Sequence, residues 1–228
     1  MKINRTKISG AADIYSDILS GLIFMVASIS LAVMLTLNFR PLFYHDIEAL
    51  DICEESGLTE EQIRENYDIL IDYNNFWGSK ELEFDGLKMS DEGRIHFEEV
   101  KAIFVKIEYA AILFTLMAIV SMIPKLRAKR YRCLLFSGIF SVVIPAVVGV
   151  IIAINWEWAF ITFHRLAFDN DYWIFDPEKD QVITMLPDGF FMHCAVMIAA
   201  VTIVMSLACL IAYILLNKRK ARREGNAG

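Results

Sequence analysis

Four long apolar stretches constrain this chain of 228 residues more than any other feature of its sequence. A bilayer core is about 30 Å thick, so a helix needs about 20 apolar residues to cross it. Each stretch reaches that length and is apolar on nearly all sides, as a lipid-facing helix must be. We therefore expect four transmembrane helices, at residues 18–37, 102–123, 134–155 and 190–216.

The charges between these stretches predict the orientation of the chain. Residues 124–133 hold five basic residues and no acid, and both termini are basic. Residues 38–101 hold 17 acids against 6 bases, and residues 156–189 hold 7 against 2. Because basic loops stay in the cytoplasm, we expect both termini inside the cell and both acidic segments outside. The basic clusters lack interleaved aromatic residues, so they indicate anionic lipid rather than nucleic acid as a partner.

The expected fold class is therefore an all-α membrane protein with four transmembrane helices and a small, mostly helical extracytoplasmic cap. The cap is formed by residues 38–101, and a second extracytoplasmic loop by residues 156–189. The cytoplasmic segments are the N-terminus at 1–17, the loop at 124–133 and the tail at 217–228.

Local patterns predict the elements of the cap. Thr59 and Gln62 have the spacing of a capping box that opens a helix. Gly57 is expected to end a short helix around 47–55, and the alternating residues 81–84 favour a short strand or hairpin. A further helix is expected to begin at Ser90 and to run unbroken into the second apolar stretch. One face of the helix after Thr59 carries Ile63, Tyr67, Leu70 and Asn74.

The four histidines all fall at or beyond the outer ends of the apolar stretches. Imidazole is the side chain best suited to proton transfer near neutral pH. His96 and His164 lie at the same predicted membrane level on separate hairpins, so together they can divide the roles of base and acid. We interpret His45 and His193 as structural.

The surroundings of His164 leave two interpretations open. Glu157 lies seven residues earlier, on the same face if the third helix continues, and Asp176 is a second candidate partner. A histidine hydrogen-bonded to lipid headgroups is the alternative. Glu108, inside the second stretch, is expected to pair with Lys101 or Lys106.

Motifs for other chemistries are missing from the sequence. There is no CxxC, HExxH, Walker or GxSxG motif. We therefore expect no metal, no cofactor and no covalent enzyme intermediate. The four cysteines do not form a disulfide framework, although a bond between Cys53 and Cys194 stays open.

The second outer segment contains the run Phe163-His164-Arg165-x-x-Phe168-x-Asn170-x-x-Trp173-x-x-Asp176-Pro177, followed by Asp180. With these residues the chain resembles the bacterial lipoprotein intramolecular transacylase (Lit) family. The resemblance covers nearly the whole chain, and a weaker part of it is the Ser90 to Lys101 stretch with His96. One departure is Glu99, where relatives usually have aspartate. The run in the second outer segment is the most specific part of the resemblance.

The resemblance implies an enzyme that moves the sn-2 acyl chain of a diacylglyceryl-cysteine lipoprotein to that lipoprotein's own N-terminal amine, which gives a lyso-form lipoprotein. The partners would be this lipoprotein and membrane lipids, and the site would lie at the extracytoplasmic face of the cell membrane. His164 would be the base, and His96 the oxyanion donor or acid. A non-enzymatic membrane sensor or assembly factor is the alternative. The residues that would bind substrate or support the site are Arg165, Asn170, Trp173, Asp176, Glu157 and Tyr67.

Overall fold

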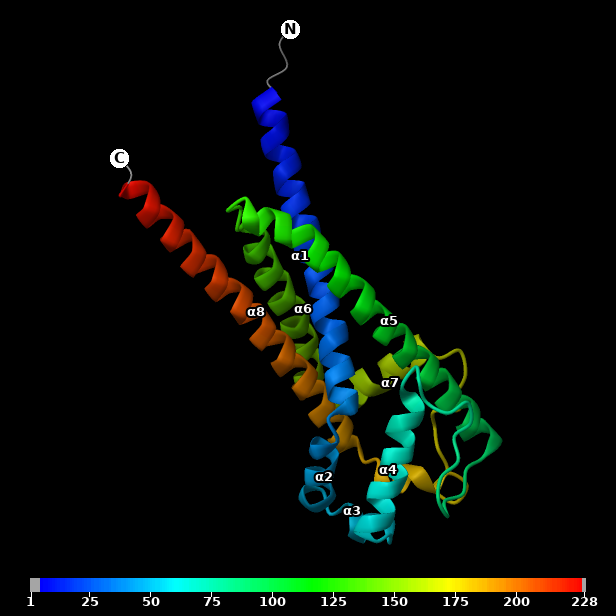
Figure 1. Cartoon of the computed structure of the whole chain (residues 1–228). Helices are drawn as coiled ribbons and strands as arrows, with labels where there is room; N and C mark the ends of the chain where they lie inside the picture. Colours follow the sequence, from blue (N-terminus) through cyan, green and yellow to red (C-terminus); the bar gives the residue numbers. More distant parts are fainter. Residues whose placement is uncertain (1–4, 227–228) are drawn as a thin grey trace. The chain divides into compact units, whose positions relative to one another are not determined.

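The computed structural model describes residues 5–226 and the side chains from Ala11 to Asn226, so the ends of the two predicted cytoplasmic termini, 1–4 and 227–228, lie outside the described residues. Four of its helices are long and apolar enough to cross a membrane, which confirms the predicted fold class. Figure 1 shows these helices, which are α1 (Arg5–Asn38), α5 (Asp91–Arg127), α6 (Arg132–Ile154) and α8 (Asp188–Gly225).

Shorter helices complete the fold. They are α2 (Arg40–Ala49), α3 (Ile52–Ser56), α4 (Glu60–Asn74), α7 (Trp156–Ala167) and the 3-10 helix η1 (Gln181–Met185). The chain packs as two units, each with its own core. The bundle unit contains the residues up to Ala32, Ala110–Val148 and the residues from Ala199, and the cap unit contains Val33–Tyr109 and Gly149–Ile198.

Small residues bring the helices of the bundle unit close together. The hydroxyls of Ser28 in α1 and Ser141 in α6 lie 3.2 Å apart, and both residues are fully buried. Ser206 in α8 donates a 2.6 Å hydrogen bond to the carbonyl of Gly138 in α6. Small side chains let helix backbones approach, and hydroxyls that bond across helices leave no polar group unpaired in an apolar environment.

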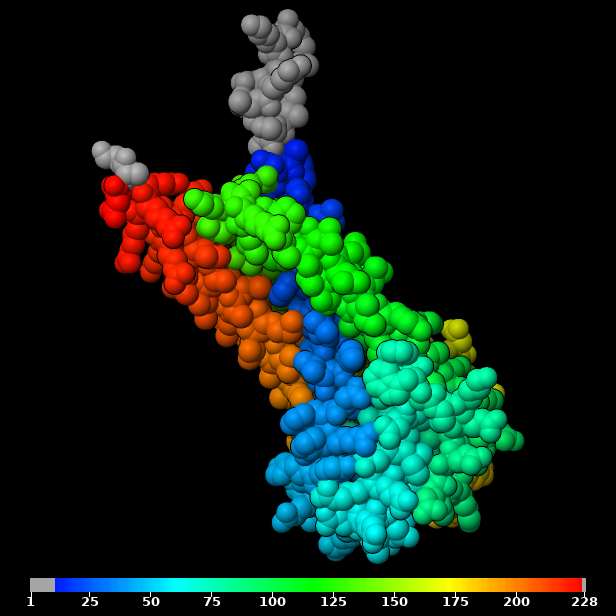
Figure 2. Space-filling view, viewed as in Figure 1, coloured from blue at the N-terminus to red at the C-terminus, as the bar shows by residue number. Residues whose placement is uncertain are grey.

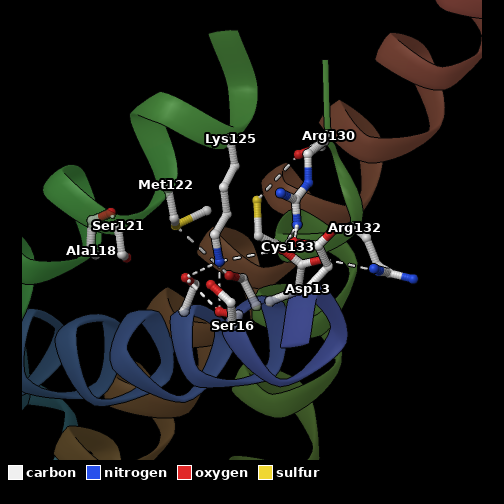
Figure 3. A network of polar contacts seen from close by, with 12 residues as sticks. Asp13, Ser16, Ala118, Ser121, Met122, Lys125, Arg130, Arg132 and Cys133 are labelled. Carbon is white, nitrogen blue, oxygen red and sulfur yellow. Dashed lines mark hydrogen bonds and ion pairs between the residues drawn. The ribbon is translucent and has the colours of Figure 1, made fainter. Parts of the chain in front are cut away.

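An ion-pair network closes one part of the bundle unit. Asp17 in α1 is only 1% exposed, and its carboxylate lies 3.3 Å from Lys125 and 2.9 Å from Arg132. Figure 3 shows Lys125 reaching from α5 toward α1, where its ammonium also donates to the Ser16 carbonyl and the Ser20 hydroxyl. A buried carboxylate requires such partners. The basic residues of the 124–133 loop therefore neutralise a buried acid.

The predicted cap helix is present as α4. Thr59 and Gln62 form the full capping box, and Ile63, Tyr67, Leu70 and Asn74 are all buried. Gly57 has a positive φ of 69° at the end of α3, as expected of a helix-ending glycine. The helix expected around 47–55 is instead two helices, α2 and α3, because the backbone turns at residues 50–51.

The strand or hairpin predicted at residues 81–84 is wrong, because this segment is irregular and residues 5–226 contain no strand. This segment has no strand partner in the described part of the chain, and two contacts with the rest of the cap fix its position instead. The Leu82 side chain is buried in the cap core. The Asn66 side chain accepts from the Asp85 amide at 2.8 Å and donates to its carbonyl at 3.1 Å.

Aromatic rings form the centre of the cap core. Phe43 in α2 stacks on Tyr67 in α4, with ring centroids 3.7 Å apart, and the edge of Phe190 in α8 packs against both rings. Figure 2 shows α2, α3, α4 and the following segment as one continuous packed surface. Tyr67 is thus part of the aromatic core of the cap, and this burial raises the pKa of its hydroxyl.

A hydrogen-bonded pair, His193 and Asp46, joins α8 to α2 within the cap unit. The Asp46 carboxylate is fully buried, and Nδ1 of His193 donates to both of its oxygens at 2.9 Å. His193 thus satisfies a buried carboxylate, which fits its structural interpretation.

Glu108 does not form the predicted lysine pair. It is 1% exposed, and its Oε2 accepts a 2.8 Å hydrogen bond from the Phe76 amide. Lys101 instead lies over the Tyr73 ring, 4.2 Å from its centroid. The prediction failed because the turn after α4 brings a backbone amide to this carboxylate.

We expect His193→Ala to lower the free energy of unfolding by about 1–3 kcal/mol, because it leaves the buried Asp46 carboxylate without its donor. Thermal unfolding in detergent would measure the change. His45→Ala is the matched control, since His45 is exposed and its loss should not affect stability. Equal unfolding temperatures for both variants would contradict the assigned role of the pair.

Candidate active site

The cap unit brings His96 of α5 and His164 of α7 together. Their ring centroids lie 6.2 Å apart, with 33° between the ring planes. His96 is only 5% exposed, and His164 is half-buried. Two imidazoles from segments far apart in sequence therefore share one environment.

Asp180 holds the segment after α7 against the first turn of α5. Its carboxylate, in a residue 4% exposed, accepts from the Ser90 amide at 2.7 Å and from the Ser90 hydroxyl at 2.9 Å. The same hydroxyl accepts from the Gly93 amide at 2.9 Å and so caps α5. A Cβ atom at Gly93 would lie 2.2 Å from Asp180 Oδ1, so only glycine permits this approach. This contact fixes the start of α5, one turn before His96.

His164 has a defined tautomer. Its Nδ1 lies 2.8 Å from the Phe160 carbonyl oxygen, which can only accept a hydrogen bond. Nδ1 therefore carries the proton, and the lone pair of the neutral ring is on Nε2. A ring held in this way is oriented to accept a proton at Nε2.

Burial lowers the pKa of His164, although the hydrogen bond to the Phe160 carbonyl and the charge of Asp188 oppose the shift. Aromatic rings provide this burial: the centroids of Phe160 and Trp173 lie 4.1 and 4.8 Å from the imidazole centroid. With a pKa below its usual value, His164 is neutral at pH 7 and can act as a base.

Three buried polar atoms at this site have no hydrogen-bond partner among the described residues. They are Nδ1 of His96, Oε2 of Glu99 and Nε1 of Trp173. The indole nitrogen is a donor, the carboxylate oxygen is an acceptor, and the imidazole nitrogen can be either. Because buried polar groups are normally paired, these atoms indicate where a ligand would bind.

Two of the predicted support residues make contacts at the site, one with His164 and the other with Glu99. Trp173 packs on the His164 ring, and Asn170 donates a 2.9 Å hydrogen bond from its amide to Glu99 Oε1. Glu99 is a site residue that the sequence analysis noted but did not assign. Its position three residues after His96, on the same helical face, was the available signal.

The other support residues make no hydrogen bond, ion pair or ring contact with either histidine among the described residues. Arg165 and Glu157 are exposed, and the Phe160 carbonyl, rather than Glu157, orients His164. Asp176 is exposed and pairs with Lys179 at 3.5 Å. Tyr67 lies in the aromatic core of the cap. A backbone acceptor leaves no trace in a sequence pattern, which is why a carboxylate partner was predicted for His164.

A metal site has no support in the described part of the chain, where no group of three His, Cys, Asp or Glu side chains is placed to hold an ion. The four cysteines are free, so the bond left open between Cys53 and Cys194 is not formed.

Comparison with known proteins relates this arrangement to one family. The model of the lipoprotein intramolecular transacylase Lit family matches residues 18–191. The solved structure of the membrane-integral lipoprotein intramolecular transacylase Lit from Bacillus cereus is similar, with a TM-score of 0.90 and 37% identity over 93% of this chain and 99% of that one. Structures of the same protein with a histidine mutated to arginine or to alanine match at a TM-score of 0.88 and 35% identity, over 96% of this chain and 98% and 100% of those chains. No curated protein sequence matches.

The lowered pKa of His164 predicts a titration midpoint below the ordinary histidine value of 6.5. His164 is then neutral at pH 7, and it loses its capacity as a base as the pH falls through the lowered pKa. NMR of histidine-labelled protein in detergent would measure this midpoint, with the signal assigned from a His164→Gln variant. A midpoint above 6.5 would contradict the assigned burial.

Proposed function

The chain belongs to the lipoprotein intramolecular transacylase (Lit) family, and from this premise we propose that it moves the sn-2 acyl chain of a diacylglyceryl-cysteine lipoprotein to the same lipoprotein's N-terminal amine. The chain is a multi-pass membrane protein and a transacylase. Amine and ester belong to one substrate molecule, so the protein needs no nucleophile of its own. The product is an N-acylated lyso-form lipoprotein, and no cofactor takes part.

This reaction makes three chemical demands. The substrate's α-ammonium must lose a proton, because only the neutral amine attacks the ester carbon. The tetrahedral intermediate then needs hydrogen-bond donors at its oxyanion, and the departing glycerol oxygen needs a proton. Holding amine and ester together lowers the entropic part of the barrier. A carbon–nitrogen bond forms and a carbon–oxygen bond breaks. The nitrogen loses two protons on the way from ammonium to amide: one is released to water, and the other is delivered to the glycerol oxygen.

The histidine pair meets these demands, and the tautomer of His164 is the observation that carries the proposal. Its Nδ1 donates to the Phe160 carbonyl, so Nε2 is free to act as the base. Nε2 first passes one ammonium proton to water, then takes a second proton from the attacking nitrogen and delivers it to the glycerol oxygen. His96, whose ring is 6.2 Å away, is the oxyanion donor or acid. The Trp173 indole N–H is buried and has no hydrogen-bond partner within residues 11–226, so it provides a further donor beside His164.

Apolar side chains near the pair support binding of the acyl chains. Phe163 and Leu166 on α7 are 55% and 84% exposed, and Ile174 in the following segment is 64% exposed. Large apolar surface of this kind suits lipid rather than water. The charge distribution supports a site at the extracytoplasmic face with both termini in the cytoplasm. The family match favours this enzyme over the sensor or assembly-factor alternative.

Replacing either His96 or His164 by alanine is expected to reduce acyl transfer by about 10²–10⁴-fold, because each change removes a proton-transfer or donor group. The measurement is the mass of the N-terminal lipopeptide from cells that make diacylglyceryl lipoprotein, with fragmentation to locate each acyl chain. Active protein moves one fatty acid to nitrogen at unchanged total mass.

His45→Ala is the matched control for this experiment, since His45 is an exposed histidine of the same unit. It should give the wild-type product at the wild-type level. Full transfer by the His96 or His164 variant, in protein that inserts normally, would remove that residue from the mechanism.

A further inference from the structure

Glu99 has one carboxylate oxygen that is paired and one that is not. Oε1 accepts the 2.9 Å hydrogen bond from the Asn170 side chain. Oε2 is buried and has no hydrogen-bond partner among the described residues. An ionised carboxylate oxygen that is buried without a donor is costly, so such an oxygen is normally paired.

Asn170 holds the carboxylate in one orientation. While its amide nitrogen donates to Glu99, its side-chain oxygen accepts from the Tyr172 amide at 3.0 Å. The Asn170 side chain is therefore fixed at both ends, and it fixes Glu99 in turn. A carboxylate held this way presents its second oxygen in a constant direction.

The missing donor is not supplied by a basic side chain of the described residues, because none of their ion pairs includes Glu99. The helix spacing and the contact with Asn170 place the Glu99 carboxylate beside the histidine site. Glu99 is on the same face of α5 as His96, and Asn170 belongs to the segment whose Trp173 packs on His164. A ligand with a cationic donor at this position would satisfy the carboxylate.

We propose that Glu99 Oε2 binds the substrate's protonated α-amine and positions it for deprotonation by His164. This assignment rests on the proposed function, in which the substrate carries a free α-ammonium. Glu99 forms a charge-assisted hydrogen bond to that group and keeps its own charge, while the proton that is removed goes to His164 Nε2. Asn170 acts through Glu99 as a positioning residue. The site thereby selects lipoproteins with a free amine over those already acylated on nitrogen.

The test compares two unreactive ligands on the full-length protein in detergent. Both are lipopeptides with two ether-linked alkyl chains, which cannot be transferred; one has a free N-terminal amine and the other is N-acetylated. We expect wild-type protein to bind the free-amine ligand at least about tenfold more tightly at pH 7. This preference should disappear when the pH is raised above the ordinary range of an α-amine, about 8, because the ligand loses its charge.

Glu99→Gln is the diagnostic variant, since it removes the charge and keeps the acceptor for Asn170. It should bind both ligands equally, whereas Glu98→Gln, a change at the adjacent exposed acid, should retain the preference. Equal affinity of the two ligands for wild-type protein would overturn the proposal without the need for any variant. A preference that survives in Glu99→Gln would overturn it as well.

The mass measurement on wild-type protein separates this proposal from the proposed function. If wild-type protein forms no N-acylated product, the proposed function fails. If it forms the product but shows no preference for the free amine, only the role of Glu99 is wrong.

Discussion

The hydrogen bonds between Asp180 and Ser90 are the contact on which the active site depends most. They join the segment after α7 to the start of α5. His164 lies in α7, just before that segment, and His96 lies in α5. The contact requires glycine at position 93, because a side chain there would occupy the position of the carboxylate. Neither histidine is in this contact, yet it holds together the parts of the chain that place their rings 6.2 Å apart.

Much of the fold was predictable because the bilayer imposes simple rules. Length and apolarity alone were enough to find α1, α5, α6 and α8, and the capping box identified the start of α4. The irregular segment at 81–84 was not predictable from its alternating pattern. Its backbone is held by Asn66, a side chain from a different element, and local sequence does not contain that information.

At the site, too, the residues could be predicted from the sequence, but their contacts with distant parts of the chain could not. His96 and His164 could be selected from residue type, predicted membrane level and family resemblance. Their actual partners could not, because the Phe160 carbonyl is a backbone atom and the Glu99–Asn170 contact joins residues 71 positions apart. Glu157 was expected on the same helical face as His164 but is exposed, and Tyr67 is buried in the aromatic core of the cap.

The acceptor for His164 Nδ1 has a consequence for how this site tolerates change. Because the acceptor is a main-chain oxygen four residues earlier in α7, replacement of the Phe160 side chain leaves the acceptor atom in place. Which imidazole nitrogen carries the proton depends instead on the backbone conformation of the helical turn between Phe160 and His164. Local unwinding of α7 would break the hydrogen bond between His164 Nδ1 and the Phe160 carbonyl. The basicity of His164 Nε2 therefore depends on this 12-residue helix staying folded.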